Sequence, residues 1–520
     1  MKPGYLLIPA IALAILAVPL IAAEIDAESE PIVFTDGLFT FQTIEDERVA
    51  AIEYDNENAE EVVEIPEWVE HDGVEYIVTD LMCSFTSDRI IGVKIPRYVW
   101  NIPYPSLIRA GNNIEAYIVH DDNYNLISDN GVLYDKKMER LIAFPKGHEL
   151  VWAFQVPNTV RIIGEYAFAG CNNVQYVNTY SEGLNEIRTG AFEGCESLMY
   201  INNVGDLNYM PDTLTIIDNG AFKDCVNIGS FVFPENLKII GESAFENTAI
   251  TSVRIPSQLV YLGACAFGNC GNLTEITSDY NVRYTVENGV LFDLGKDAKT
   301  LMTYPAGKTG AEYTIDDEVT SIADMAFAGT KYLKKVNLSM GAMMIPAGSF
   351  ADCTSLEEID LSRIVLIDAS AFWNCVNLRT VTFGDTLATI NSSAFENCGL
   401  EEVVLPPSVN YIGPYAFYDC KNLKKFTISD YSTAEVYLGA WNRCLNLEEI
   451  DLLSSDIRLE EGALNIADEQ PIGVTVVKPK GYVIPSDAVT DGLTTLTLRD
   501  IGERPYPLEN LVGVAICILI

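Results

Sequence analysis

The chain has 520 residues, of which 74 are acidic and 33 are basic, so its formal net charge is -41 at pH 7. A surface this acidic repels phosphate backbones and anionic lipid headgroups, which argues against nucleic acids and membrane surfaces as partners. The length allows several ordinary domains or one extended repeat array, and the periodicity of the sequence has to decide between them.

The first 23 residues are typical of an export signal. Lys2 precedes an unbroken apolar run that ends in small residues, and cleavage after Ala23 fits this pattern. The run from Tyr5 to Ala23 is 19 residues long, which also permits an uncleaved N-terminal membrane anchor. We therefore expect an exported protein at the cell surface or in the extracellular space.

Residues 24–80 alternate polar and apolar side chains, which predicts a β-rich cap over the end of a repeat array. Residues 81–115 are expected to be degenerate early repeats, because VKIPRYV keeps a strand followed by proline. Residues 116–158 and 279–316 hold two related insertions, NGVLYDKKMERLIAF and NGVLFDLGKDAKTLMTY. Two apolar runs around a polar turn predict a β-hairpin in each.

A repeat of mostly 22 to 24 residues organises residues 159–278 and 317–453. Each copy reads I-x-x-x-A-F-x-x-C and continues into an alternating L-x-x-I-x-L segment. The aromatic position is occupied by Phe168, Phe192, Phe222, Phe245, Phe267, Phe327, Phe350, Phe372, Phe395, Phe417 and Trp441. A period of this length indicates a β-rich solenoid in the leucine-rich-repeat range.

The alternating segments predict short strands that stack into one concave parallel sheet, because a single unit cannot bury its own apolar face. The phenylalanines then form an internal spine, and burial of each ring contributes roughly 1.5 to 3 kcal/mol. Residues 454–505, with VTVV and LTTLTL, are expected to form a closing β cap. Residues 506–520 are an apolar tail that is either a terminal strand or the start of a membrane anchor.

The unit I-x-x-x-A-F-x-x-C-x-x-L-x-x-V-x-[IL]-P resembles the BspA-type leucine-rich repeat of secreted and surface proteins from host-associated microbes. The resemblance implies a leucine-rich-repeat solenoid with inserted hairpins and an adhesin-like role toward matrix proteins, plasma proteins or other cells. Thr248 and Thr330 depart from the pattern at the cysteine position. The strongly acidic balance is a further departure, so the resemblance does not name the ligand.

Nine of the twelve cysteines occupy the repeat position. They are Cys171, Cys195, Cys225, Cys270, Cys353, Cys375, Cys398, Cys420 and Cys444. The chain has no C-x-x-C pair and only three histidines, which argues against zinc. A thiol nucleophile needs a base to ionise it, and nine copies cannot each have one. We expect a ladder of buried reduced thiols, although export also permits disulfides between coils.

No catalytic residue, cofactor or metal site is expected, and the partner is expected to be an extracellular protein or glycan. The candidate ligand-binding residues are those that alternate with the buried positions of the strands and so face solvent. They are Tyr176, Asn178, Tyr200, Asn202, Ser252, Arg254, Lys335, Asn337, Glu358 and Asp360. The alternative is a structural spacer or envelope component without a specific ligand, and the oligomeric state stays open.

Overall fold

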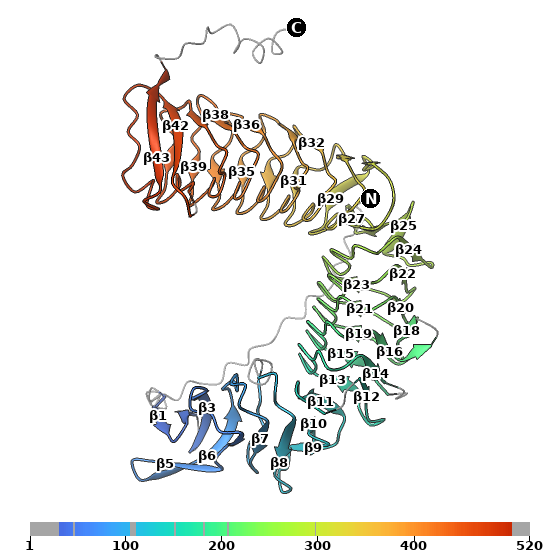
Figure 1. The fold of residues 1–520 in the computed structure, drawn as a ribbon. Helices are drawn as coiled ribbons and strands as arrows, with labels where there is room; N and C mark the ends of the chain where they lie inside the picture. Colours follow the sequence, from blue (N-terminus) through green and yellow to red (C-terminus); the bar gives the residue numbers. More distant parts are fainter. Residues whose placement is uncertain are drawn as a thin grey trace, which may run out of the picture.

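Parallel strands stacked coil upon coil build most of the molecule. A computed structural model of the chain describes residues 31–44, 47–103, 111–149, 152–179, 183–204, 207–296, 298–467 and 469–501. Within these ranges the regular structure consists of strands, and no α-helix is present. Figure 1 shows the coils arranged along an open arc, which confirms the predicted β-rich solenoid.

A mixed five-stranded sheet begins the described chain, in the order β1-β2-β3-β6-β5. Its strands are β1 (Val33–Asp36), β2 (Phe39–Thr43), β3 (Arg48–Tyr54), β5 (Trp68–His71) and β6 (Val74–Leu81). Phe41 and Val78 of this sheet share one hydrophobic core with Val93 of the following coils. The sheet therefore covers the open end of the stack, whose terminal apolar face otherwise meets water.

Coils begin ahead of the regular array, in a region that includes residues 81–115, where degenerate repeats were expected. Three strands pair in parallel: β4 (Val62–Glu64), β7 (Gly92–Ile95) and β8 (Ala116–Val119). Pro96 follows β7 directly and has no N–H to continue the ladder, so the strand ends there.

Most regular coils contribute one strand to each of two columns, and the coil between Ile187 and Ile216 contributes three short strands to one of them. In Figure 1 one column lies toward the inner side of the arc and the other toward its outer side, and we call them the inner and the outer column. The inner column comprises β13 (Ile162–Ile163), β15 (Glu186–Ile187), β19 (Ile216–Ile217), β21 (Ile239–Ile240), β23 (Tyr261–Leu262), β29 (Val319–Ile322), β31 (Met344–Ile345), β33 (Leu366–Ile367), β35 (Thr389–Ile390), β37 (Tyr411–Ile412), β39 (Glu435–Val436) and β41 (Arg458–Leu459).

The outer column holds the alternating L-x-x-I-x-L segments. It comprises β12 (Ala153–Gln155), β14 (Tyr176–Asn178), β16 (Tyr200–Ile201), β17 (Asn203–Val204), β18 (Leu207–Tyr209), β20 (Phe231–Val232), β22 (Ser252–Ile255), β24 (Glu275–Ser278), β28 (Glu312–Thr314), β30 (Lys335–Asn337), β32 (Glu358–Leu361), β34 (Thr380–Phe383), β36 (Glu402–Leu405), β38 (Lys425–Ile428) and β40 (Glu449–Leu452). We call the coils from β12 to β24 the first array and those from β28 to β41 the second array.

The expectation of a concave sheet is wrong for the outer column. Its strands lie toward the convex side of the arc, and the inner column lies nearer the concave side (Figure 1). The direction of curvature follows from the small rotation between neighbouring coils. Repeat spacing in the sequence does not specify the sense of that rotation.

The phenylalanine column is the internal spine that the repeat predicted. The rings of Phe350, Phe372 and Phe395 are fully buried. Neighbouring ring centroids in this trio lie 5.2 and 5.0 Å apart, and the planes are tilted by only 5° and 6°. Trp441 is also fully buried at its place in the column. The spine therefore runs through the core of the array and is shielded from ligands.

The turn between spine and cysteine explains another regularity of the repeat. The residue directly before the cysteine has a positive φ, for example 57° at Asp352 and 61° at Asn374. Only glycine, asparagine and aspartate adopt this left-handed conformation readily. Most coils have one of these three residues there, including Gly170, Gly194, Asp224, Asn247, Asn269, Asn397 and Asp419.

Each insertion is a three-stranded meander, which adds one strand to the predicted hairpin. The first comprises β9 (Leu126–Asp129), β10 (Val132–Asp135) and β11 (Arg140–Ala143); the second comprises β25 (Tyr284–Glu287), β26 (Val290–Leu294) and β27 (Lys299–Thr303). Asn130 and Gly131 connect the first two strands with φ of 49° and 79°. Positive φ at both central residues is the type I′ turn that Asn-Gly favours.

The central strand of each meander separates two hydrophobic cores. In β10, Val132 and Tyr134 belong to the core of the first array, whereas Leu133 belongs to the N-terminal core. In β26, Leu291 belongs to the core of the first array and Val290 to that of the second. The meanders are therefore partitions that share their two faces between neighbouring cores, because side chains alternate along a strand.

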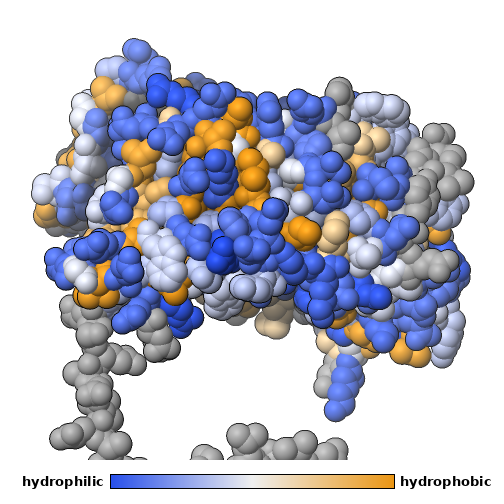
Figure 2. All heavy atoms as spheres, turned by 90° about the horizontal axis from the view of Figure 1, so that it is seen from below, coloured by the Kyte–Doolittle hydropathy of each residue, from blue (hydrophilic) through white to orange (hydrophobic). Residues whose placement is uncertain are grey.

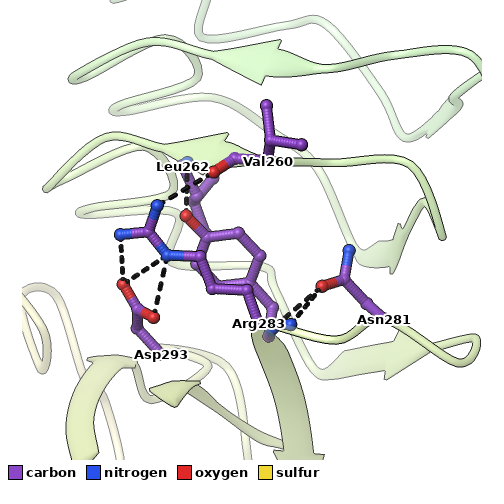
Figure 3. A network of polar contacts seen from close by, with 6 residues as sticks. Val260, Leu262, Asn281, Arg283 and Asp293 are labelled. Atoms are coloured by element: carbon purple, nitrogen blue, oxygen red, sulfur yellow. Dashed lines mark hydrogen bonds and ion pairs between the residues drawn. The ribbon is translucent and has the colours of Figure 1, made fainter. Parts of the chain in front are cut away.

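Polar contacts fix the second meander to the last coil of the first array (Figure 3). Arg283 donates to both carboxylate oxygens of Asp293 at 2.8 to 3.1 Å and to the carbonyl oxygen of Val260 at 2.9 Å. The buried Asn281 donates to the carbonyl oxygen of Leu259 at 2.9 Å. The bidentate contact orients the Arg283 guanidinium within the meander, and the hydrogen bonds to Val260 and Leu259 then attach the meander to the coil.

The C-terminal end is closed by two long parallel strands, β42 (Ile472–Lys478) and β43 (Thr494–Asp500). β42 extends the outer column by pairing with β40. The sequence predicted strands in this region. The export signal or anchor at residues 1–23 and the apolar tail at 506–520 lie outside the described residues.

Candidate functional site

The repeated cysteines are buried free thiols, as the sequence predicted. The Sγ atom of Cys375 lies 3.0 Å from the carbonyl oxygen of Phe350 in the preceding coil, to which the thiol donates a hydrogen bond. The same contact, at 2.9 to 3.2 Å, is made by Cys195, Cys225, Cys270, Cys353, Cys398, Cys420 and Cys444. The sequence analysis expected burial but missed this hydrogen-bonded ladder.

The two threonines at the cysteine position fit the same environment. Thr248 and Thr330 are buried, and their hydroxyl groups find partners within the column. Thr248 donates to the carbonyl oxygen of Phe245 at 2.9 Å, and Thr330 donates to Sγ of Cys353 at 3.1 Å. The position therefore takes a small side chain with a hydrogen-bond donor, which both residue types supply.

Burial disfavours the thiolate form of cysteines in the column, as two of them illustrate. Burial raises the pKa of Cys270 to about 11, and it raises the pKa of Cys375 well above its usual value. Cys270 and Cys375 therefore stay protonated at neutral pH, whereas nucleophiles and metal ligands need the thiolate. Within the described part of the chain, no group of three or more His, Cys, Asp or Glu side chains could hold a metal ion.

Three aromatic rings line up on the outer column at the start of the first array. Trp152 precedes β12, and Tyr176 and Tyr200 begin β14 and β16. The centroids of Trp152 and Tyr176 lie 5.8 Å apart with the rings edge to face, and those of Tyr176 and Tyr200 lie 5.2 Å apart with the rings stacked. Trp152 is 60% exposed and the tyrosines are half-buried. We call these three residues the aromatic row.

Strand register produces this arrangement. Tyr176 pairs with Tyr200 in neighbouring parallel strands, and the carbonyl oxygen of Trp152 accepts a hydrogen bond from the backbone N–H of Tyr176 at 2.9 Å. Equivalent positions in parallel strands lie about 4.8 Å apart, a separation at which aromatic rings contact one another. Register therefore aligns Tyr176 with Tyr200, whereas Trp152 precedes Ala153, the register partner of Tyr176, and its ring contacts Tyr176 from there.

Two asparagines predicted beside the tyrosines differ in their environment. Asn178 is half-buried, and its side-chain amide has no hydrogen-bond partner among the described residues. The expectation that Asn202 faces solvent is wrong, because its side chain is 7% exposed and bonds to Thr179 and Tyr209. β16 ends at Ile201 and Asn202 has a φ of 49°, so the strand alternation that predicted an outward side chain stops there.

The remaining predicted residues lie on the outer column, separate from the aromatic row. Ser252 is half-buried, and Arg254 is exposed and forms ion pairs with Glu235 and Asp279. These contacts hold the Arg254 guanidinium against carboxylates of this chain.

In the second array, two of the four predicted side chains pair with each other. Nζ of Lys335 lies 2.5 Å from Oε1 of Glu358, and this hydrogen bond raises the pKa of Lys335. Asn337 donates to Glu312 at 2.8 Å, and Asp360 is exposed. Exposed ion pairs of this kind contribute little to stability, because solvent screens the charges.

Other exposed apolar side chains are more dispersed. Figure 2, a view from below, shows hydrophobic residues in groups that hydrophilic residues separate. In the N-terminal part, Trp68 is 46% exposed and contacts Tyr98 with ring centroids 5.5 Å apart. Tyr411 and Tyr437 form another surface pair at 5.0 Å. The aromatic row differs from these pairs because its three rings continue across successive coils.

Sequence reasoning found the two tyrosines of the row but missed Trp152. The signal was available in AFQVP at residues 153–157, which has the same alternation and following proline as the regular outer strands. Residues 116–158 were instead interpreted as one insertion.

The family model described as BspA type leucine rich repeat region matches residues 143–211, 202–291, 308–398 and 343–467, in 6 copies. These matches cover more than half of the chain. No curated protein matches it. Among the described residues, no helix has the length and apolar character needed to cross a membrane.

Several solved structures are similar in fold. A leucine rich cell surface protein from Faecalibacterium prausnitzii is 21% identical with a TM-score of 0.47, and the likeness covers 86% of this chain and 100% of that one. The pneumococcal vaccine antigen PcpA is 18% identical with a TM-score of 0.46, covering 91% and 99%. A leucine-rich repeat protein from Eubacterium ventriosum is 20% identical with a TM-score of 0.43, covering 70% and 95%.

Proposed function

Because the chain belongs to the BspA-type leucine-rich-repeat family, we propose that it is an exported, non-enzymatic binding protein with an adhesin-like role at the cell surface. Its partner in this proposal is an extracellular protein or glycan. The aromatic row is the observation that carries the proposal, because aromatic side chains with polar tips dominate binding hot spots.

The construction of the outer column supports a binding role. Its strands are held by parallel pairing across successive coils, and the spine beneath them is fully buried. A surface that is already ordered loses little conformational entropy when it binds. Exposed rings on such a surface therefore supply contact area without first having to be immobilised.

An array of glycans and matrix proteins at physiological salt tests the proposal. We expect the purified chain to bind at least one of them saturably, and Tyr176→Ala combined with Tyr200→Ala to abolish that binding. Tyr431→Ala is the matched control, because Tyr431 is 83% exposed and lies on a turn in the second array. Binding to nothing on the array contradicts the proposal and supports the structural spacer instead.

Export is tested separately by fractionating cells that express the full chain. We expect the protein in the envelope or medium, with its N-terminus after Ala23 if the apolar run is a cleaved signal. Recovery of the uncleaved protein in the cell interior contradicts the proposed location.

A further inference from the structure

We infer that the aromatic row, with the adjoining amide of Asn178, binds a neutral oligosaccharide. The inference rests on the proposed binding function and specifies the class of its ligand. The site consists of Trp152, Tyr176, Tyr200 and Asn178, all on the first three coils of the first array.

The local absence of charge is the first argument. Strands β12, β14, β16, β17, β18 and β20 have the sequences AFQ, YVN, YI, NV, LNY and FV and contain no charged residue. The whole chain nevertheless has a formal charge of -41. A neutral ligand that binds over these strands does not have to desolvate a charged side chain of the strands. A charged ligand would lose its own hydration there without gaining a counter-charge. The acidic remainder of the surface also repels anionic glycans.

The second array shows the contrast. Its outer strands β30, β32, β38 and β40 begin with Lys335, Glu358, Lys425 and Glu449. These form cross-strand pairs at 2.5 Å for Lys335 with Glu358 and 2.7 Å for Lys425 with Glu449. The positions that Tyr176 and Tyr200 occupy in the first array are therefore taken by charged residues on these four strands of the second array.

The chemistry of the row is the second argument. A sugar ring has an apolar face of C–H bonds and a rim of hydroxyl groups that both donate and accept hydrogen bonds. Trp152, at 60% exposure, offers an indole surface for the apolar face. The hydroxyl groups of Tyr176 and Tyr200 and the Asn178 amide form no hydrogen bonds to other described residues, so they can serve the rim.

The spacing of the row is the third argument. The ring centroids advance by 5.8 and 5.2 Å, which is about the length of one pyranose unit in a linear chain. Consecutive sugars can therefore contact consecutive rings. Charged groups, which steer and orient protein partners, are lacking on these strands, and this favours the glycan over a protein.

Titration with neutral linear oligosaccharides tests the inference. The probes are hexamers of β-linked glucose, mannose, xylose and N-acetylglucosamine, with calorimetry and tryptophan fluorescence as readouts on the full chain. We expect at least one hexamer to bind saturably, and Trp152→Ala and Tyr200→Ala each to weaken binding about tenfold or more. Tyr176→Phe keeps the ring and should weaken binding less than Tyr176→Ala. Tyr431→Ala should have no effect.

Salt separates a neutral ligand from a charged one. We expect the dissociation constant to change less than about twofold between 0.05 and 0.5 M NaCl, because no ion pair contributes to it. Absence of saturable binding by every neutral hexamer up to about 10 mM overturns the inference. The inference is also overturned if the Trp152→Ala and Tyr200→Ala variants melt like the parent chain and still bind the hexamer with unchanged affinity. If the variants lose binding to a matrix protein and no hexamer binds, the proposed function stands and the ligand class is wrong.

Discussion

Phe372→Ala probes the spine at its most regular point. The Phe372 side chain is completely buried, with 0% of its surface exposed to water. Its ring stacks between those of Phe350 and Phe395, with centroid distances of 5.2 and 5.0 Å. Truncation removes a ring from a closely packed column and leaves a cavity that the neighbouring coils fill only in part. Such substitutions cost about 3 to 5 kcal/mol. The two lost ring contacts, at about 0.5 to 1.5 kcal/mol each, favour the upper half of that range.

The damage should remain within the second array. The core that contains Phe372 runs from Val290 to Ala488, and a separate core from Val132 to Leu291 serves the first array. Coils of a solenoid interact mainly with their neighbours, so a cavity in one core has little effect on the other. We therefore expect faster amide exchange in residues 335–405 and unchanged exchange in residues 160–262.

Hydrogen exchange with mass spectrometry, combined with urea unfolding, measures both effects. Tyr431→Ala is the control, because an 83% exposed side chain should change stability by less than about 0.5 kcal/mol. A loss below about 1 kcal/mol for Phe372→Ala refutes the spine as a major source of stability. Equal acceleration of exchange in the two arrays refutes the partition of the cores.

Three further predictions concern the thiol column, pH and the partition turn. Cys375→Thr should be tolerated and Cys375→Ala should lose about 1 kcal/mol in urea unfolding, because only threonine retains a donor near Phe350; equal losses contradict the ladder. Although burial alone raises it, the pKa of Glu449 is lowered overall by Lys425 and Arg499. Because the pKa of Glu449 in the folded protein lies below the unfolded value of 4.5, the Glu449 carboxylate stabilises the fold above that pH and loses this effect as the pH falls. Glu449→Gln should therefore lower the melting temperature at pH 7, and the difference from the parent chain should shrink below pH 4.5. A difference that grows below pH 4.5 contradicts the ion pairing of Glu449. Gly131→Ala should lower the melting temperature more than Gly73→Ala. Both glycines have a positive φ, 79° and 81°, but only at Gly131 would the new Cβ lie close to another atom, 2.9 Å from Cβ of Ala116. Equal losses for the two variants refute the close contact.

The repeat pattern was sufficient to predict the stacked coils, because every unit has apolar side chains at the same positions that must be buried against the neighbouring units. The aromatic position recurs mostly every 22 to 24 residues, so the burial of Phe372 could be inferred from the ten other copies of its position. Curvature could not be inferred in this way, since it depends on small rotations between coils. The Asn-Gly pairs at 130–131 and 288–289 are typical of type I′ turns, and each therefore also indicates the additional strand that precedes it in the meander.

The candidate site was predictable only where a strand keeps its alternation. Tyr176 and Tyr200 were identified because β14 and β16 follow the pattern. The orientation of Asn202 was predicted wrongly because its backbone leaves the strand conformation. No particular residue type in the sequence indicates that change. Trp152 was missed because its coil precedes the first regular Ala-Phe copy, although its strand pairs in register with β14.

Because the meanders separate the hydrophobic cores of the two arrays, the outer surfaces of the arrays can differ in residue type. Each array buries its own core against a meander, so substitutions on the outer column of one need not be matched in the other. In the second array the charged rungs pair within the sheet, as Lys335 does with Glu358. In β14 and β16 of the first array these positions carry Tyr176 and Tyr200, whose hydroxyl groups, like the Asn178 amide, form no hydrogen bond to other described residues. Groups that the fold does not need are those available to a ligand, which is why the uncharged rungs of the first array are the part of this surface to test for binding.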